Sequence, residues 1–197
     1  MNYGETLAYW YLRLNGFIPM RNFVLHPSVD ATDKNSADSD LLAVRFPHVY
    51  EEIGGQPDDW DITWNKWGLQ LEKEIIGLIV EVKTSPEIGP GQVSNAFSGM
   101  RLQQAIHRMG MFESENVSLL VEGLMQKSFV KEGSYCVGKM LFSHRKGDNL
   151  WMNMTFEDTV KFIQKRMKNY SQDKRRARMF FPDELVQYFA WKAGMEQ

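Results

Sequence analysis

Glu81 and Lys83 are the residues whose types and spacing most directly suggest chemistry. They lie in the stretch LIVEVKTS, residues 78–85, which is otherwise apolar and rich in β-branched residues. On a pleated strand, positions two residues apart face the same side. Charged side chains are rarely buried without a partner, so a strand inside the fold needs something that meets this pair.

The predicted elements around this pair include a helix at the start of the chain. In NYGETLAYWYLRLNGF, Asn2 and Glu5 have the spacing of a capping box, and Asn15-Gly16 is a typical helix end. The helix is apolar nearly all round, so we expect it to be buried on two sides. Glu5 lies on its Ala8 side, and its carboxylate can point inward.

Strands and helices then follow one another along the chain. Strands are predicted over residues 21–26, 39–46, 74–85, 117–125 and 134–144. Helices are predicted over about 94–109, where Arg101 is expected to face outward, over about 155–170, and over 181–194. The strand SDLLAVRF carries Asp40 at its start, with Asp38 two residues earlier on the same side.

A tryptophan-rich segment at about residues 47–74 fits two patterns. Trp60, Trp64 and Trp67 fit one face of a helix, but Trp64 also fits the alternation of a strand. In both interpretations we expect the tryptophans to pack in the fold rather than to act as stacking platforms for bases.

The order of these elements resembles the PD-(D/E)xK nuclease superfamily, which includes restriction endonucleases and Holliday-junction resolvases. The resemblance rests on GETLAYWYLRLNGF, SADSDLLAVRF and IVEVKTS, and it covers roughly residues 1–145. The motifs are short, so it is their order and placement that carry the resemblance. Ser39 stands where the family often has proline, and the long insertion between Asp40 and Glu81 also departs from the pattern.

The resemblance implies an α/β fold. The expected structure is a restriction-endonuclease-like αβββαβ core with a mixed central sheet flanked by helices, plus a C-terminal helical extension. We place the core at residues 1–150, with the insertion at about 47–74, and a basic helical extension at 151–197. A chain of 197 residues suits one domain with such an appendage, or two small domains.

The resemblance also implies a site for a divalent cation. Asp40 and Glu81 would hold magnesium together with the carbonyl oxygen of Val82, and manganese is expected to substitute. Magnesium prefers carboxylate oxygens, keeps several waters and stabilises the charge that develops when a phosphodiester is hydrolysed. Lys83 would orient the attacking water and offset this charge. Glu5 would assist from the first helix, as in many family members.

Simpler explanations exist for each of these residues. Glu81 and Lys83 can form a surface ion pair on an edge strand, worth at most about 1 kcal/mol, although the apolar neighbours favour an interior strand. Asp40 can simply cap a turn, and Asp38 is the alternative ligand; we prefer Asp40 because it directly precedes LLAV. The capping-box role of Glu5 would by itself explain that residue.

The composition restricts the function classes. Cys136 is the only cysteine, so an internal disulfide is excluded and an inert core thiol is expected. The four histidines lack ligand-like spacing, so zinc chemistry is not expected. No apolar run approaches the roughly 20 residues of a membrane span, and the N-terminus lacks a secretory pattern, so we expect a cytoplasmic protein without membrane contact.

The segment 161–178 is strongly basic. It holds eight basic residues and one acidic residue, although the whole chain has a net charge of −2. Such a segment predicts salt-sensitive, sequence-independent binding of nucleic acid, and a solvated helix face is the alternative. The predicted contacts are Lys161, Lys165, Lys168, Lys174, Arg175, Arg176 and Arg178.

The leading hypothesis is therefore a magnesium-dependent nuclease, with DNA as the expected substrate. Its predicted catalytic residues are Asp40, Glu81, Lys83 and Glu5. One alternative is a catalytically inactive nucleic-acid-binding module on the same fold. Another is a protein-interaction module that contacts a second copy or another protein through Trp60, Trp64 and Trp67.

Overall fold

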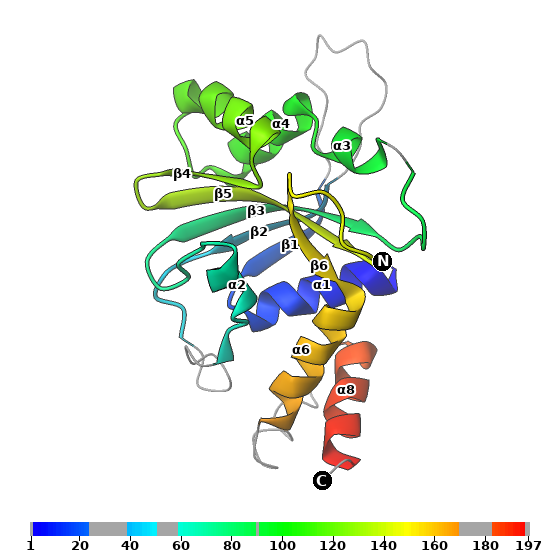
Figure 1. Ribbon diagram of the computed structural model, residues 1–197. Coiled ribbons are helices and arrows are strands. Elements are labelled where there is room, and N and C mark those ends of the chain that lie inside the picture. Colours follow the sequence, from blue (N-terminus) through cyan, green and yellow to red (C-terminus); the bar gives the residue numbers. More distant parts are fainter. Residues whose placement is uncertain (1, 24–38, 51–58, 90, 170–182, 196–197) are drawn as a thin grey trace.

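The computed structural model describes residues 2–23, 39–50, 59–89, 91–169 and 183–195. A mixed sheet of six strands forms the centre, and helices cover both of its faces (Figure 1). This architecture confirms the predicted α/β class with a mixed central sheet flanked by helices. The restriction-endonuclease-like core itself stays a prediction.

The strands of the sheet are β1 (Ile18–Phe23), β2 (Ser39–Arg45), β3 (Ile75–Lys83), β4 (Phe129–Glu132), β5 (Tyr135–Ser143) and β6 (Met152–Thr155). Their order is β1-β2-β3-β5-β4, and β6 pairs in parallel with the half of β5 that β4 leaves open. β2 is antiparallel to β1 and β3, whereas β3 and β5 are parallel. β3 thus lies inside the sheet, as its continuous apolar run predicts.

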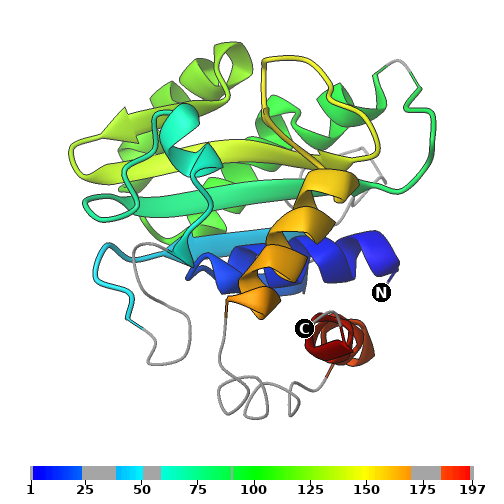
Figure 2. The same cartoon turned by 60° about the horizontal axis from the view of Figure 1, so that its bottom comes forward.

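The helices divide between the two faces. α1 (Tyr3–Leu14), α2 (Thr63–Lys66), α6 (Phe156–Lys168) and α8 (Glu184–Met195) share one core cluster, and α6 crosses α1 (Figure 2). On the other face, α3 (Gln92–Ala96), α4 (Gly99–Met109) and α5 (Val117–Gln126) form the second cluster. None of the helices in these described ranges has both the length and the apolar character needed to cross a bilayer.

Helix α1 is buried on two sides, as its sequence predicts. The Asn2 side chain accepts a hydrogen bond from the Glu5 N–H at 2.9 Å, which confirms the predicted N-cap. Leu12 and Tyr11 are fully buried, and the Tyr11 ring packs edge-on against Phe142 of β5 and Phe162 of α6. α1 therefore lies between the sheet and α6, and this packing fixes where its first turn meets the ends of the strands.

Two predicted elements differ from the structure. Residues 117–125 form helix α5, so the strand predicted there is wrong. The apolar residues VSLLV bury Val117, Leu120 and Leu124, which share one helical face, while Leu119 is 73% exposed. The helix predicted over about 94–109 is interrupted, because α3 ends at Ala96 and a new helix begins after Ser98 in an extended conformation.

Gly4 lets α1 approach β3 closely. A Cβ atom at this position would lie 2.5 Å from Thr84 Cγ2 and 3.0 Å from Val82 Cγ1. Both neighbours are β-branched residues with few rotamers to choose from, so they cannot move aside easily. The close approach places the first turn of α1, with Glu5, at the carboxyl end of β3.

Replacing Gly4 with alanine should therefore lower the free energy of unfolding by about 1–3 kcal/mol, the usual cost of overpacking a core. Urea denaturation followed by circular dichroism measures this change. Gly194 in α8 is the matched control, since no atom would lie within 4 Å of a Cβ there. Gly194→Ala should stabilise the protein slightly, and a Gly4→Ala protein of unchanged stability would refute the proposed close approach.

Candidate active site

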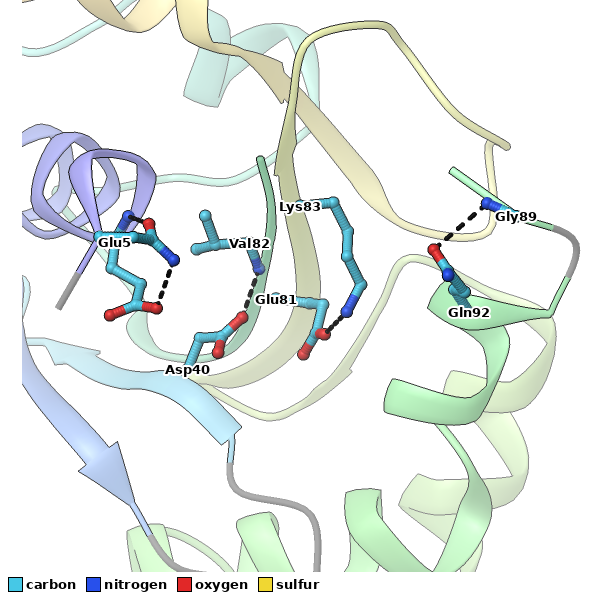
Figure 3. Close-up of polar contacts among 8 residues, drawn as sticks. Glu5, Asp40, Glu81, Val82, Lys83, Gly89 and Gln92 are labelled. Carbon is cyan, nitrogen blue, oxygen red and sulfur yellow. Dashed lines mark hydrogen bonds and ion pairs between the residues drawn. The ribbon is translucent and has the colours of Figure 1, made fainter. Parts of the chain in front are cut away.

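Asp40 and Glu81 lie on neighbouring strands and face the same side of the sheet. Leu41 of β2 pairs with Val80 of β3, and continuing this antiparallel register by one residue places Asp40 opposite Glu81. The Val82 N–H donates a hydrogen bond to Asp40 Oδ2 at 2.7 Å (Figure 3). Two acids that are far apart in the sequence therefore meet at the carboxyl end of β3.

The environment of Glu81 is unfavourable for a negative charge. The residue is only 8% exposed, and burial raises the pKa of its carboxyl group, as does the nearby charge of Asp40. Lys83 and Arg101 act in the opposite direction. Asp40 is close enough to raise the pKa of Glu81, so a bound cation would stabilise the negative charges of these two carboxylates.

Lys83 meets Glu81 directly. Its Nζ atom forms an ion pair with Glu81 Oε1, and the two side chains lie on the same face of β3 (Figure 3). β3 is an interior strand and Glu81 is buried, so the interpretation of the pair as a surface ion pair on an edge strand is wrong.

Glu5 is placed by the capping interaction. Asn2 Nδ2 donates a hydrogen bond to Glu5 Oε1 at 2.7 Å, in addition to the backbone contact of the cap. In Figure 3, Glu5 lies on the α1 side of Asp40, with Glu81 on the other side. The Asn2 cap is confirmed, but the Glu5 carboxylate meets the Asn2 side-chain amide rather than the backbone N–H of a capping box, and the catalytic role of Glu5 stays a prediction.

The two acids can be tested against the needs of magnesium. This ion is commonly bound through one or two carboxylates, with waters and substrate phosphates completing its shell, so a pair of carboxylates fits. Within the described ranges, no third histidine, cysteine, aspartate or glutamate joins Asp40 and Glu81. Asp38, the alternative ligand, lies outside the described residues, and the metal-binding role of the Val82 carbonyl stays a prediction.

Arg101 lies beside the candidate site, and helical periodicity predicted its position wrongly. It was expected to face outward from its helix, but in α4 it is half-buried and near enough to Glu81 to lower the pKa of that carboxyl group. Helical periodicity alone cannot show that α4 packs on the face of the sheet that carries the acids. An arginine here adds a second positive charge beside the site.

Part of the predicted nucleic-acid surface can be located. Lys161, Lys165 and Lys168 are exposed on α6, and Lys161 pairs with Glu157 at 2.6 Å. Lys161 and Lys165 also line a cavity of about 1110 Å³. The other predicted contacts, Lys174, Arg175, Arg176 and Arg178, lie outside the described residues.

The tryptophans of the insertion are packing residues first, as predicted. Trp64 is fully buried and lies 5.0 Å from Phe17, between ring centroids. Trp60 and Trp67 are half-buried, and the guanidinium groups of Arg45 and Arg166 lie 5.0 and 5.5 Å from the Trp60 ring centroid. Contact with a protein partner through this segment stays a prediction.

Two further buried groups lie on β5. Burial raises the pKa of the Cys136 thiol to about 12, as expected for an inert core thiol. Lys139 is 3% exposed, and burial lowers its pKa from 10.5 to about 8, a shift that Asp148 partly opposes. Its partner in β3 is Ile79, so Lys139 lies on the same face as Glu81.

Lys139→Met should stabilise the fold at neutral pH. The shift from 10.5 to about 8 corresponds to about 3 kcal/mol of lost stability. This penalty is fully present below the pKa of Lys139 in the folded protein, because Lys139 is then charged in the folded and in the unfolded state. It disappears as the pH rises towards the unfolded pKa, because the native state loses its proton first.

Urea denaturation at about pH 7 and about pH 10 tests this. The variant should be more stable than the wild type at the lower pH, and the difference should shrink at the higher pH. If the stability difference between Lys139→Met and the wild type is the same at both pH values, the buried charge of Lys139 does not cause it.

Comparison with known proteins adds no relative. No family model, curated protein or solved structure matches this chain.

Proposed function

We propose that the protein is a divalent-metal-dependent nuclease that hydrolyses phosphodiester bonds in DNA. The observation that supports this most is the placement of Asp40 and Glu81 on one face of the sheet, with Lys83 paired to Glu81. A buried glutamate beside a second carboxylate and a lysine is costly unless these charges serve a ligand that needs them. A cation together with a phosphate is such a ligand.

Each residue has a distinct role in this proposal. Asp40 and Glu81 would hold magnesium or manganese, with the Val82 carbonyl as a further ligand. When bound, the metal supplies Lewis-acid stabilisation of the charge on the phosphate oxygens. Lys83 orients the attacking water towards the phosphorus, and its ammonium group offsets the developing negative charge.

Two other residues support these roles. The charge of Arg101 lowers the pKa of Glu81, and it favours an anionic substrate at this end of the sheet. Glu5 assists from α1, where its interaction with Asn2 restricts its side chain. Arg101 and Glu5 therefore assist Asp40 and Glu81 without holding the metal in this proposal.

The basic face of α6 gives the expected contact with the DNA backbone. Lys161, Lys165 and Lys168 are three exposed cations on one side of this helix. Neutralising phosphates releases counterions, so binding should weaken as the salt concentration rises. This contact carries no sequence preference of its own.

Removing the metal tests the proposal directly. Purified protein should cleave labelled DNA in magnesium or manganese, should lose this activity in EDTA, and should regain it when magnesium is added in excess. Lys83→Ala protein, purified in the same way, excludes a contaminating nuclease. Cleavage that persists in EDTA, or that is equal in Lys83→Ala, would refute the proposal. Tight DNA binding with no products in either metal would favour the inactive binding module.

A further inference from the structure

A cavity of about 530 Å³ opens between two loops beside the candidate active site. One loop follows β3 and includes Ser85, and the other follows β5 and includes Arg145. Leu141 of β5 lines the cavity and pairs in register with Glu81. Neighbouring strands are about 4.8 Å apart and paired side chains face the same side, so the cavity begins one strand away from Glu81.

An aromatic ring forms part of the wall of this cavity. Trp151 lines it and is half-buried, and its ring centroid lies 5.8 Å from that of Phe97, with the planes tilted by 37°. This packing holds the indole in place on its buried side. A fixed aromatic face at the edge of a cavity is a platform on which any base can stack.

The charge around the cavity favours an anion. Arg145 and Lys146 are exposed on its rim, and Glu87 is the only acidic residue among its described lining residues. The His144 ring is turned to the α1 side, where its Nε2 lies 2.9 Å from the Tyr3 hydroxyl. Beneath the wall, Lys139 adds a buried positive charge that Asp148 partly offsets, with Nζ 5.8 Å from the Phe97 ring centroid.

A flat ring joined to a phosphate fits all three features, and this is the chemistry of a nucleotide. The cavity volume also lies within the range of about 300–1,000 Å³ that small-molecule sites occupy. A base inside a duplex is stacked and paired, so it must leave the helix before it can enter such a cavity.

From these observations we infer that the cavity binds an unpaired nucleotide next to the bond that is cut, so that the substrate is single-stranded at this position. This inference rests on the proposed function for the location of the cut bond.

Binding measured without metal tests the inference. Fluorescence anisotropy in EDTA would compare a short, fluorescein-labelled single strand with the blunt duplex of the same sequence. The wild type should bind the single strand about tenfold more tightly than the duplex. Gel analysis after the measurement confirms that both probes remain intact.

Two variants identify the cavity as the cause. Trp151→Ala removes the platform, and Ser94→Leu fills the cavity from an exposed position on α3 without adding an aromatic face. Each should weaken single-strand binding about tenfold and leave duplex binding unchanged. Trp191→Ala is the control, since Trp191 is 54% exposed on α8 and does not line the cavity.

The outcomes separate this inference from the proposed function. Equal binding of single strand and duplex by the wild type, or unchanged single-strand binding by Ser94→Leu, overturns the cavity assignment even if the protein cleaves DNA. Ser94 is exposed, so its variant gives a result even if Trp151→Ala fails to fold. Selective single-strand binding that both variants abolish supports the cavity assignment even if no metal gives cleavage.

Discussion

Replacing Asp40 with asparagine should lower the rate of magnesium-dependent DNA cleavage by about 10³-fold. The substitution removes one of the two negative charges that would hold the metal, and losing several kcal/mol of transition-state stabilisation gives an effect of this size. An asparagine oxygen can still accept the hydrogen bond from the Val82 N–H, so the fold should be retained. Initial rates on a labelled oligonucleotide at saturating magnesium measure the effect.

A surface carboxylate serves as the control for this substitution. Glu157 has a 75% exposed side chain and pairs only with Lys161 among the contacts that the structure describes. Glu157→Gln should cleave at the wild-type rate. If Asp40→Asn also keeps that rate, Asp40 does not hold the metal, and the acid pair has another purpose.

Lys83→Met should reduce cleavage by about 10²–10⁴-fold, the range expected when a positioned proton-transfer or charge-stabilising group is lost. The methionine keeps most of the side-chain volume but cannot orient water or offset charge on the phosphate. The same substitution leaves Glu81 without its ion-pair partner, so some loss of stability is also expected. Rates must therefore be compared with thermal unfolding of the same samples.

The chain contains a matched pair for this comparison. Glu74 directly precedes β3 at the end opposite to Glu81, and Lys131 of β4 pairs with it at 2.5 Å. The side chains of Lys131 and Glu74 are 33% and 11% exposed, close to the 27% and 10% of Lys83 and Glu81. Lys131→Met should lower stability by a similar amount and leave cleavage intact. Equal loss of activity in both variants would mean that Lys83 acts only through the stability of the fold.

Much of the site could be predicted because its residues break the local pattern. Charges at positions 81 and 83 interrupt an apolar strand, and Asp40 stands at the start of another. Interior strands with unexpected charges need a common partner, so their convergence follows from the cost of burial. The register that places Asp40 opposite Glu81 could not be predicted from the sequence. A long connection separates β2 from β3, so it does not fix which residues of the two strands pair.

Other features were predicted wrongly, or not predicted, for related reasons. The apolar residues of α5 form a short continuous run, and such a run fits a buried strand and a buried helix equally well. Arg101 occupies the polar side of its helix, which is normally the solvent side, but packing of α4 against the sheet brings it near Glu81. Lys139 carried a usable signal: like Lys83, it is a single lysine within an apolar strand.

The location of a bound manganese ion tests the central claim most directly. Crystals soaked in manganese chloride should show an anomalous difference peak in contact with the carboxylates of both Asp40 and Glu81, and crystals of Asp40→Asn should lose it. A peak that touches only one of these acids, or no peak there when both side chains are ordered, would contradict the assignment of this acid pair as a metal site.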